Sequence, residues 1–315
     1  MPKRFWSIVG IASASAAALT VIAGFGPTAA AQTPVTRTVY VSAVDKQGAP
    51  VTDMQAADFE VKEGGKVQEI AVQPATAPLR VSILVADWGT GSFQAGMAGF
   101  MEKLLGHAEF ELISVLPQPV TVTELTGDPA RLSDGLGQLG SRGRQQGAQL
   151  LEAIRDTARE IPADAPRPVI LVLRIGNEGV SPLSGNNVRD PLRKSGAILE
   201  VVSVGVRTAA SPTAGGGLGM SAAAARAQMH DDEARQSAFA LAQVMGDGAK
   251  ETGGRNEQVI STSLVPMLES VADELLHQYE MTYTLPAGQK PDDKLEVKSK
   301  RQDVTVRAPT RLEND

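Results

Sequence analysis

Few residues in this sequence combine the types and spacings that catalysis needs. The densest polar cluster with a histidine is His230-Asp231-Asp232-Glu233, which could support acid–base or metal chemistry. Its composition is more typical of the solvated start of a helix, where acidic side chains interact favourably with the helix dipole. His277 is expected at the C-terminal end of a helix, in a capping or partly buried role. The sequence has no G-x-S-x-G, H-E-x-x-H or Walker motif, so we predict no catalytic residues and no enzymatic activity.

The composition excludes several further classes of site and partner. The chain has 315 residues, of which 42% are apolar, and a formal net charge of −6. It has no cysteine, which removes disulfides, thiolate nucleophiles and cysteine-bound metals. Aromatic residues make up only 4%, too few for a base-stacking surface, and the negative charge disfavours polyanionic partners. We therefore expect no nucleic-acid partner and no cofactor.

Residues 1–31 have the pattern of a secretory signal peptide. Lys3 and Arg4 precede an alanine-rich apolar stretch, and Ala29-Ala30-Ala31 offers small residues for cleavage. The alternative is an uncleaved membrane anchor, because the apolar stretch is close to the length that spans a bilayer. Cleavage after Ala31 removes both basic residues and leaves a net charge of −8 in place of −6. We expect an exported protein, periplasmic or extracellular, with no membrane span after cleavage.

The two ends of the remaining chain have the two-residue period of β-strands. In the N-terminal segment, 32–78, residues 38–44 alternate, and Glu63-Gly64-Gly65-Lys66 gives a strong signal for a hairpin between strands at 59–62 and 67–72. The C-terminal segment, 278–315, has further strands at 279–285, 295–297 and 304–306. Neither segment has enough strands to bury its apolar face alone. We expect the two segments to pack together into one small β module.

Between these ends, residues 79–277 alternate buried strands with helices. This order predicts an α/β domain with a doubly wound, mostly parallel sheet. Residues 208–228 are rich in Ala, Gly, Ser and Pro, and their glycine run lacks the Lys-Ser/Thr of a phosphate loop, so we predict a flexible insertion there. Strands are expected at 81–86, 110–116, 120–125, 168–173 and 198–206, and helices at 97–105, 150–161, from about 231, and at 264–275.

Three short segments resemble motifs of exported bacterial proteins that have a von Willebrand factor A-related domain. Asp58–Ile70 (DFEVKEGGKVQEI) is similar to the family's DFxVxEDGKxQxI segment, Lys250–Arg255 (KETGGR) to its xETGGR turn, and Gln278–Tyr283 (QYEMTY) to its QYxLxY strand. The three occur in the family's order, and the resemblance covers nearly all of residues 38–307. It implies a von Willebrand A-like α/β domain flanked by β segments.

The resemblance also implies a place for a divalent cation. In the family, a D-x-S-x-S loop, a threonine and a later aspartate offer hard oxygen ligands for Mg²⁺ at the carboxyl ends of the strands. This sequence keeps the first aspartate as Asp87. Gly89 and Gly91 stand at the serine positions, Ala148 at the threonine and Ile175 at the second aspartate, so four of the five ligands are absent. We predict no metal at this site.

We predict that this edge of the sheet is a protein-binding surface instead. The carboxylate of Asp87 is expected to be bonded by backbone amides and by Arg174, and Trp88 beside it is either core or interface. Two functions stay open. One is an exported, non-catalytic interaction protein whose metal-ion-dependent adhesion site is lost, with a protein partner of unknown identity. The other is a cation-dependent adhesion module with a rearranged site around Asp87, Thr90 and Glu178. The candidate binding residues are Asp87, Trp88, Thr90, Ser92, Arg174 and Glu178.

Overall fold

The computed structural model describes residues 34–87, 89–141, 149–176, 179–205, 222–286 and 289–313. All of them belong to one compact unit, which runs from Pro34 to Asp315. The expected signal peptide, most of the expected insertion, Trp88, Ala148 and Glu178 lie outside the described residues. Among the described helices, none combines the length and the apolar composition needed to cross a membrane.

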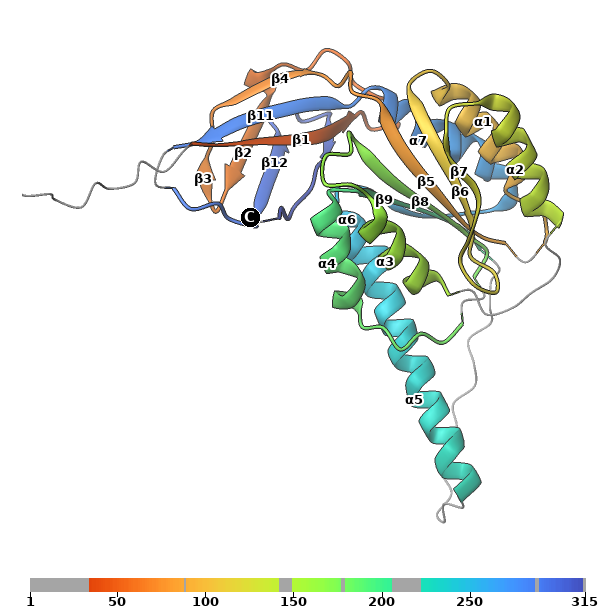
Figure 1. The fold of residues 1–315 in the computed structure, drawn as a ribbon. Coiled ribbons are helices and arrows are strands. Elements are labelled where there is room, and N and C mark those ends of the chain that lie inside the picture. Colours follow the sequence, from red (N-terminus) through yellow and green to blue (C-terminus); the bar gives the residue numbers. More distant parts are fainter. Residues whose placement is uncertain are drawn as a thin grey trace, which may run out of the picture. The chain divides into compact units, whose positions relative to one another are not determined.

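A six-stranded sheet forms the centre of the α/β domain (Figure 1). Its strand order is β10-β9-β8-β5-β6-β7, which corresponds to the 3-2-1-4-5-6 order of doubly wound sheets. All neighbours pair in parallel except β7, which runs antiparallel to β6 at one edge. The predicted fold class is therefore confirmed. The strands are β5 (Leu79–Ala86), β6 (Ala108–Ser114), β7 (Val120–Thr126), β8 (Pro168–Arg174), β9 (Ile198–Val204) and β10 (Asn256–Val259).

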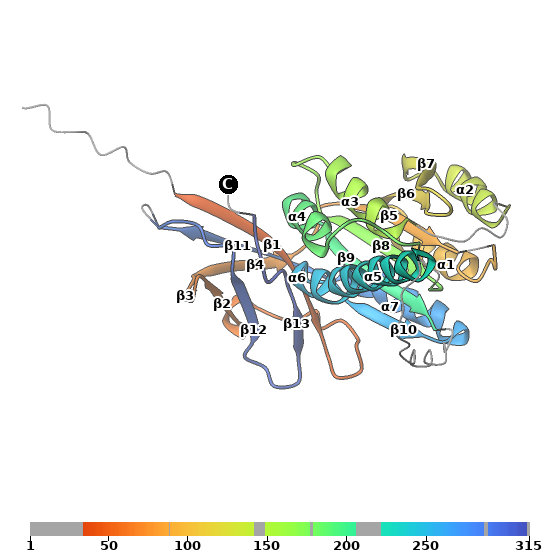
Figure 2. The ribbon, with the colours of Figure 1, turned by 90° about the horizontal axis from the view of Figure 1, so that it is seen from below.

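Helices cover both faces of this sheet, as the views in Figures 1 and 2 show. Strand β8 is apolar along most of its length because it is covered twice: Val169, Leu171 and Leu173 join one hydrophobic core, whereas Ile170 and Val172 join the other. Helices α1 (Gln94–Leu104), α2 (Pro129–Ser141) and α7 (Leu264–Leu276) border the first core. The second is bordered by α3 (Leu150–Glu160), α4 (Gly185–Ser195), α5 (Ala222–Gln243), a π-helical segment (Val244–Gly248) and α6 (Ala249–Glu251).

Strands from the two ends of the chain pair with each other, as expected. Strand β1 runs antiparallel to β11 from Val35 opposite Leu285 to Val41 opposite Tyr279. The resulting module has a four-stranded sheet, β13-β1-β11-β4, and a three-stranded sheet, β12-β2-β3, with a third hydrophobic core. Its strands are β1 (Val35–Val44), β2 (Phe59–Glu63), β3 (Lys66–Val67), β4 (Ile70–Pro74), β11 (Tyr279–Leu285), β12 (Leu295–Ser299) and β13 (Thr305–Arg307). Two single-turn 3-10 helices, Ala56–Asp58 and Ser261–Ser263, complete the described elements.

The predicted hairpin at Gly64-Gly65 forms, but its second strand is much shorter than expected. Both glycines have positive φ, and β3 pairs with the end of β2 over two residues only. The chain then crosses to the other sheet, where β4 pairs with β11 from Ile70 opposite Tyr283 to Pro74 opposite Tyr279. The single strand predicted at 67–72 is therefore two short strands in different sheets, and Ile70 and Val72 pack against the module core from the four-stranded sheet.

Helix α5 also departs from the sequence-based expectation. It begins at Ala222, so residues 222–228, assigned above to a flexible insertion, are helical. The alanine run there has the highest intrinsic helix propensity, which explains the difference. Asp231, Asp232 and Glu233 are exposed in the middle of this helix, whereas they were expected at its start.

Candidate functional site

The carboxyl ends of the parallel strands bring the predicted site residues to one edge of the sheet. Asp87 directly follows β5, and Arg174 is the last residue of the neighbouring strand β8, where it lies opposite Ala86. Ile175 follows Arg174 and is 7% exposed, with its side chain in the first hydrophobic core. An apolar side chain therefore occupies the position at which the resembling family has an aspartate.

The loop after β5 closes on itself. The carboxylate Oδ1 of Asp87 accepts hydrogen bonds from the backbone amide of Thr90 at 2.9 Å and from the Thr90 hydroxyl at 2.8 Å. The Ser92 hydroxyl lies 2.7 Å from Thr90 Oγ1, which also accepts from the Ser92 amide at 3.1 Å. The buried side chain of Phe93 anchors the end of the loop. Oδ1 of Asp87 and the hydroxyls of Thr90 and Ser92 thus form a chain of contacts within the loop.

Two glycines shape this loop. Gly89 has a φ of 85° and Gly91 a φ of 68°, a region that residues with a Cβ rarely adopt. These are the two positions at which the resembling family has serines. Serine at either position of this loop would therefore be strained.

The expected bonding of Asp87 by a backbone amide agrees with this geometry, whereas its pairing with Arg174 stays a prediction. Arg174 is partly buried at the end of β8. Trp88 and Glu178, the other candidates, are not among the described residues. Within the described part of the chain, no three His, Cys, Asp or Glu side chains lie close enough together to hold a metal ion.

Sequence reasoning missed how the loop after β8 is fixed. The Ser181 hydroxyl donates to Glu152 Oε1 of α3 at 2.6 Å, and its amide donates to Ser237 Oγ of α5 at 2.9 Å. The Leu183 amide then donates to Ser181 Oγ at 3.1 Å. This anchoring leaves the neighbouring Val180 59% exposed at the edge of the loop. The one indication in the sequence was Glu152, an acidic residue in the first turn of α3 that accepts the bond from Ser181.

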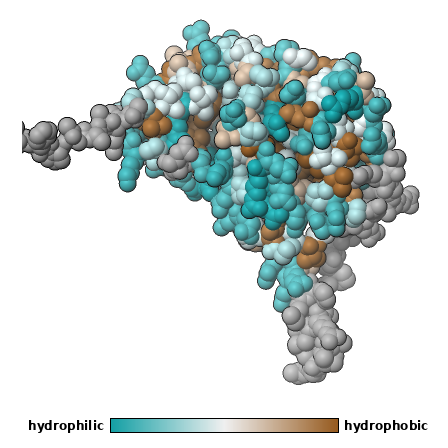
Figure 3. Space-filling view, viewed as in Figure 1, coloured by the Kyte–Doolittle hydropathy of each residue, from teal (hydrophilic) through white to brown (hydrophobic). Residues whose placement is uncertain are grey.

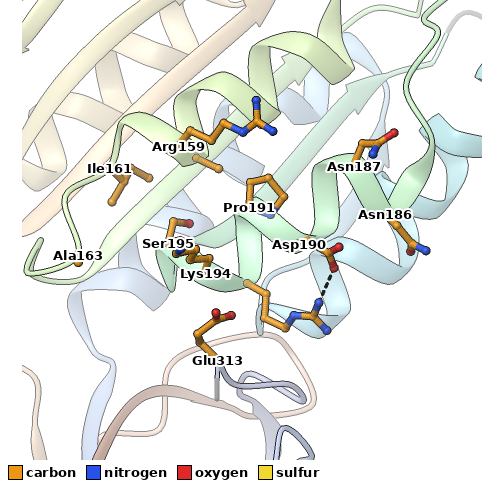
Figure 4. Close-up of a pocket in the computed structure, with 12 residues that line it drawn as sticks. Arg159, Ile161, Ala163, Asn186, Asn187, Asp190, Pro191, Lys194, Ser195 and Glu313 are labelled. Atoms are coloured by element: carbon orange, nitrogen blue, oxygen red, sulfur yellow. Dashed lines mark hydrogen bonds and ion pairs between the residues drawn. The ribbon is translucent and has the colours of Figure 1, made fainter. Parts of the chain in front are cut away.

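A surface depression of about 700 Å³ lies elsewhere, between α3 and α4 (Figure 4). Arg159, Asn187 and Lys194 are among its lining residues, and Asp190 is engaged by Arg193 in an ion pair. Figure 3 shows hydrophilic side chains gathered over these two helices. Ser195 is also in the lining, and its hydroxyl donates to the backbone carbonyl of Leu192 at 2.8 Å.

Two motif residues, Glu63 and Gln278, make buried polar contacts. Glu63 is 1% exposed and accepts from the Tyr283 hydroxyl at 2.7 Å and from the Asp292 amide at 2.8 Å. Burial, followed by the nearby Glu63 carboxylate, raises the pKa of Tyr283. Gln278 donates to Ser42 of β1 and accepts from Arg167 at 3.0 Å. These motif residues therefore hold the β module together and attach it to the α/β domain.

Arg255, the last residue of the KETGGR motif, joins three elements at a buried cluster of charges, which we call the junction: Glu200, Arg255, Glu274 and Arg307. Arg255 Nε donates to Glu200 Oε2 at 3.2 Å, and Arg255 and Arg307 both donate to Glu274 Oε2. Glu200 belongs to β9, Glu274 to α7 and Arg307 to β13. The junction therefore links the central sheet to the C-terminal β segment.

Comparison with known proteins gives similarity in structure only. No protein-family model matches the sequence, and no curated protein matches it either. Proximal thread matrix protein 1 from the mussel byssus matches with a TM-score of 0.41 and 11% identity, over 73% of this chain and 51% of that one. The vWF domain of the type V pilus tip protein Mfa5 from Porphyromonas gingivalis matches with a TM-score of 0.27 and 20% identity, over 32% of this chain and 39% of that one.

The VWA domain of SpRpn10 matches with a TM-score of 0.37 and 10% identity, over 61% of this chain and 94% of that domain. The chain spans about half the length of the mussel protein it matches. At such scores the α/β class rests on the strand order and the two helix layers described above.

Proposed function

We propose that this chain is an exported, non-catalytic interaction module on a von Willebrand A-like scaffold, and that it binds a protein partner through the loops at the carboxyl ends of its parallel strands. The proposed division is a cleaved signal peptide at 1–31, a β module built from 32–78 and 278–315, and an α/β domain at 79–277 with an insertion within 208–228. The observation that carries the proposal is the closed loop after β5, in which Asp87 already accepts two hydrogen bonds from Thr90.

The chemistry of this edge suits contact with a protein better than coordination of a cation. A Mg²⁺ ion takes hard oxygen ligands in near-octahedral geometry, which requires several oxygens directed at one point. Here Oδ1 of Asp87, the Thr90 hydroxyl and the Ser92 hydroxyl are directed at one another. Thr90 and Ser92 are exposed on the loop after β5, and Val180 is exposed on the loop after the neighbouring strand β8; polar and apolar groups of this kind are typical of protein interfaces.

A thermal-shift titration tests the prediction that the loop around Asp87 binds no divalent cation. We expect 10 mM Mg²⁺ or Mn²⁺ to leave the Tm unchanged, because only a ligand that binds the native state raises it. A site with a Kd of about 0.1 mM would stabilise the protein by about 2.7 kcal/mol at this concentration and raise the Tm by several degrees. A dose-dependent rise that Asp87→Ala abolishes would instead establish the cation-dependent adhesion module.

Capture of the partner tests the binding surface. The mature protein is immobilised, incubated with the envelope fraction of its source cells, and the retained protein is quantified by mass spectrometry. We expect Trp88→Ala to reduce capture about tenfold, as truncation of a central aromatic contact does, and Asp87→Ala to leave it nearly unchanged. Val67→Ala is the control, since Val67 is 66% exposed on β3 in the β module. Equal capture by wild type and Trp88→Ala, or loss with Val67→Ala alone, would contradict the proposed surface.

A further inference from the structure

The junction is unusual because it buries four charged groups between parts of the chain that are far apart in sequence. The side chains of Glu200 and Glu274 are each 3% exposed, that of Arg255 is 8% exposed and that of Arg307 25%. Removing such groups from water costs free energy that only good pairing offsets. The number of hydrogen bonds that each carboxylate accepts from the arginines therefore decides which of the two takes up a proton more readily.

The pairing is uneven. Glu274 Oε2 accepts from two guanidinium groups, those of Arg255 and Arg307. Glu200 accepts from Arg255 Nε alone among the bonds described, at 3.2 Å, and this same guanidinium also serves Glu274. The two carboxylates thus share Arg255, and Glu200 has the weaker part of it. A buried carboxylate in this position gains by taking up a proton.

The segment that carries Arg307 is the part of the junction best able to separate. Strand β13 has three residues and pairs only with β1, over three positions from Ser42 opposite Arg307 to Val44 opposite Thr305. Beyond it, the Thr310 amide donates to the Glu251 carbonyl at 2.9 Å. The Thr310 carbonyl in turn accepts from the Leu295 amide of β12 at 3.0 Å. Apart from the β1 pairing, these are the two backbone hydrogen bonds described for residues 305–310, and Arg307 is their described contact with the buried acids.

We propose that Glu200 is a proton-binding group that makes docking of the C-terminal β segment, residues 305–313, on the α/β domain tighter in mildly acidic than in alkaline solution. This device is independent of the loop surface proposed above and would survive the failure of that proposal. An exported protein is exposed to the pH outside the cell. In this proposal that pH sets the protonation of Glu200 and thereby how tightly the C-terminal β segment docks on the α/β domain.

The electrostatics of Glu200 have the required direction. Burial raises the pKa of Glu200 to about 7; Glu274 of α7 also raises it, whereas Arg255 and Arg307 lower it. Strand β8, the neighbour of β9, places the apolar Leu171 opposite Glu200. The proposal requires that opening of the junction admits water to Glu200, because hydration returns its pKa towards the ordinary value of 4.5 and outweighs the loss of Arg307. Between about pH 4.5 and 7 the docked form binds more protons than the open form, so docking weakens as the pH rises through this window.

Hydrogen exchange measured by mass spectrometry on the whole chain tests the proposal. The opening equilibrium of residues 300–313, corrected for the intrinsic exchange rate, is compared at pH 6 and pH 8. For the wild type we expect about tenfold more opening at pH 8, from the pKa difference given above. Glu200→Gln, which mimics the protonated acid, should open equally at both pH values. Glu269→Gln, a change at an exposed position on α7, should keep the wild-type dependence.

Equal opening of the wild type at both pH values, or the same pH dependence in Glu200→Gln, would overturn the proposal. If Glu200→Gln does not fold, carboxyl-carbon NMR of the wild type decides. A glutamate carboxyl that titrates near pH 7 supports the proposal, and titration of every glutamate below pH 5.5 refutes it.

Discussion

Replacing Arg255 with methionine is expected to lower the free energy of unfolding by about 3–5 kcal/mol, the cost of leaving buried charges without a partner. The variant keeps much of the side chain's length but removes the guanidinium that bonds both Glu200 and Glu274. Arg307 still reaches Glu274, so most of the loss comes from Glu200. Urea unfolding followed by circular dichroism measures the effect at pH 8, which is above the pKa of about 7 that Glu200 has in the wild type.

The matched control is Arg235→Met on α5. Arg235 is 76% exposed and pairs with Asp232 one turn away, so its removal should change stability very little. Adding Glu200→Gln to Arg255→Met should restore part of the loss, because the unpaired charge is then gone. An Arg255→Met protein as stable as the control would mean that the junction contributes nothing to the attachment of the β module.

The sequence predicted the architecture because the fold depends on apolar patterning. Continuous apolar runs identified the doubly covered strands, such as β8, and period-two alternation identified β1 and β11. We predicted that these two strands pair because neither end of the chain has enough strands to bury its apolar face by itself. The hairpin at Gly64-Gly65 was predicted as well, but local pattern contains no information on which sheet the next strand joins.

Neither α2 nor α4 was predicted from the sequence, because both contain residues that weaken the local helical pattern. Helix α2 contains Gly135 and Gly137, and α4 contains Pro191, residues that lower helix propensity. Gly135 is required by packing, because a Cβ there would lie 2.0 Å from Thr123 Oγ1. The close packing of α2 against β7 thus favours glycine at position 135, and glycine makes the helix harder to predict from sequence.

The candidate site was only partly predictable. Asp87 could be located, since it follows a buried apolar strand, and the self-closing turn with Thr90 agrees with the expectation of a protein partner for its carboxylate. The junction was not foreseen, because its four charges come from residues between 19 and 107 positions apart in the sequence. One signal was present: Glu200 is the single charged residue in the apolar strand Ile198–Val204. A charge in such a strand indicates a partner elsewhere in the fold.

The glycine pair in the KETGGR motif, Gly253 and Gly254, leads to the second large effect. Gly254 packs directly against strand β9: a Cβ at this position would lie 2.1 Å from the carbonyl oxygen of Leu199 and 2.7 Å from its carbonyl carbon. Both are backbone atoms of a central strand, which pairs with β8 and β10 on its two sides. The preceding Gly253 has a φ of 83°, and a Cβ there would lie 2.7 Å from the backbone of Ala308. The motif therefore needs glycine at both positions for separate reasons.

Gly254→Ala is accordingly expected to destabilise the protein by at least about 3 kcal/mol, at the upper end of the cost of overpacking, because neither backbone can move away without breaking the sheet. Urea unfolding of the purified variant measures this, and a fall in soluble yield should accompany it. The control is Gly99→Ala in α1, where a Cβ meets nothing within 4 Å. That change should stabilise the protein by up to about 1 kcal/mol through helix propensity. If both variants unfold at the same urea concentration as the wild type, the turn does not fix the C-terminal segment against β9, and the motif must be retained for another reason.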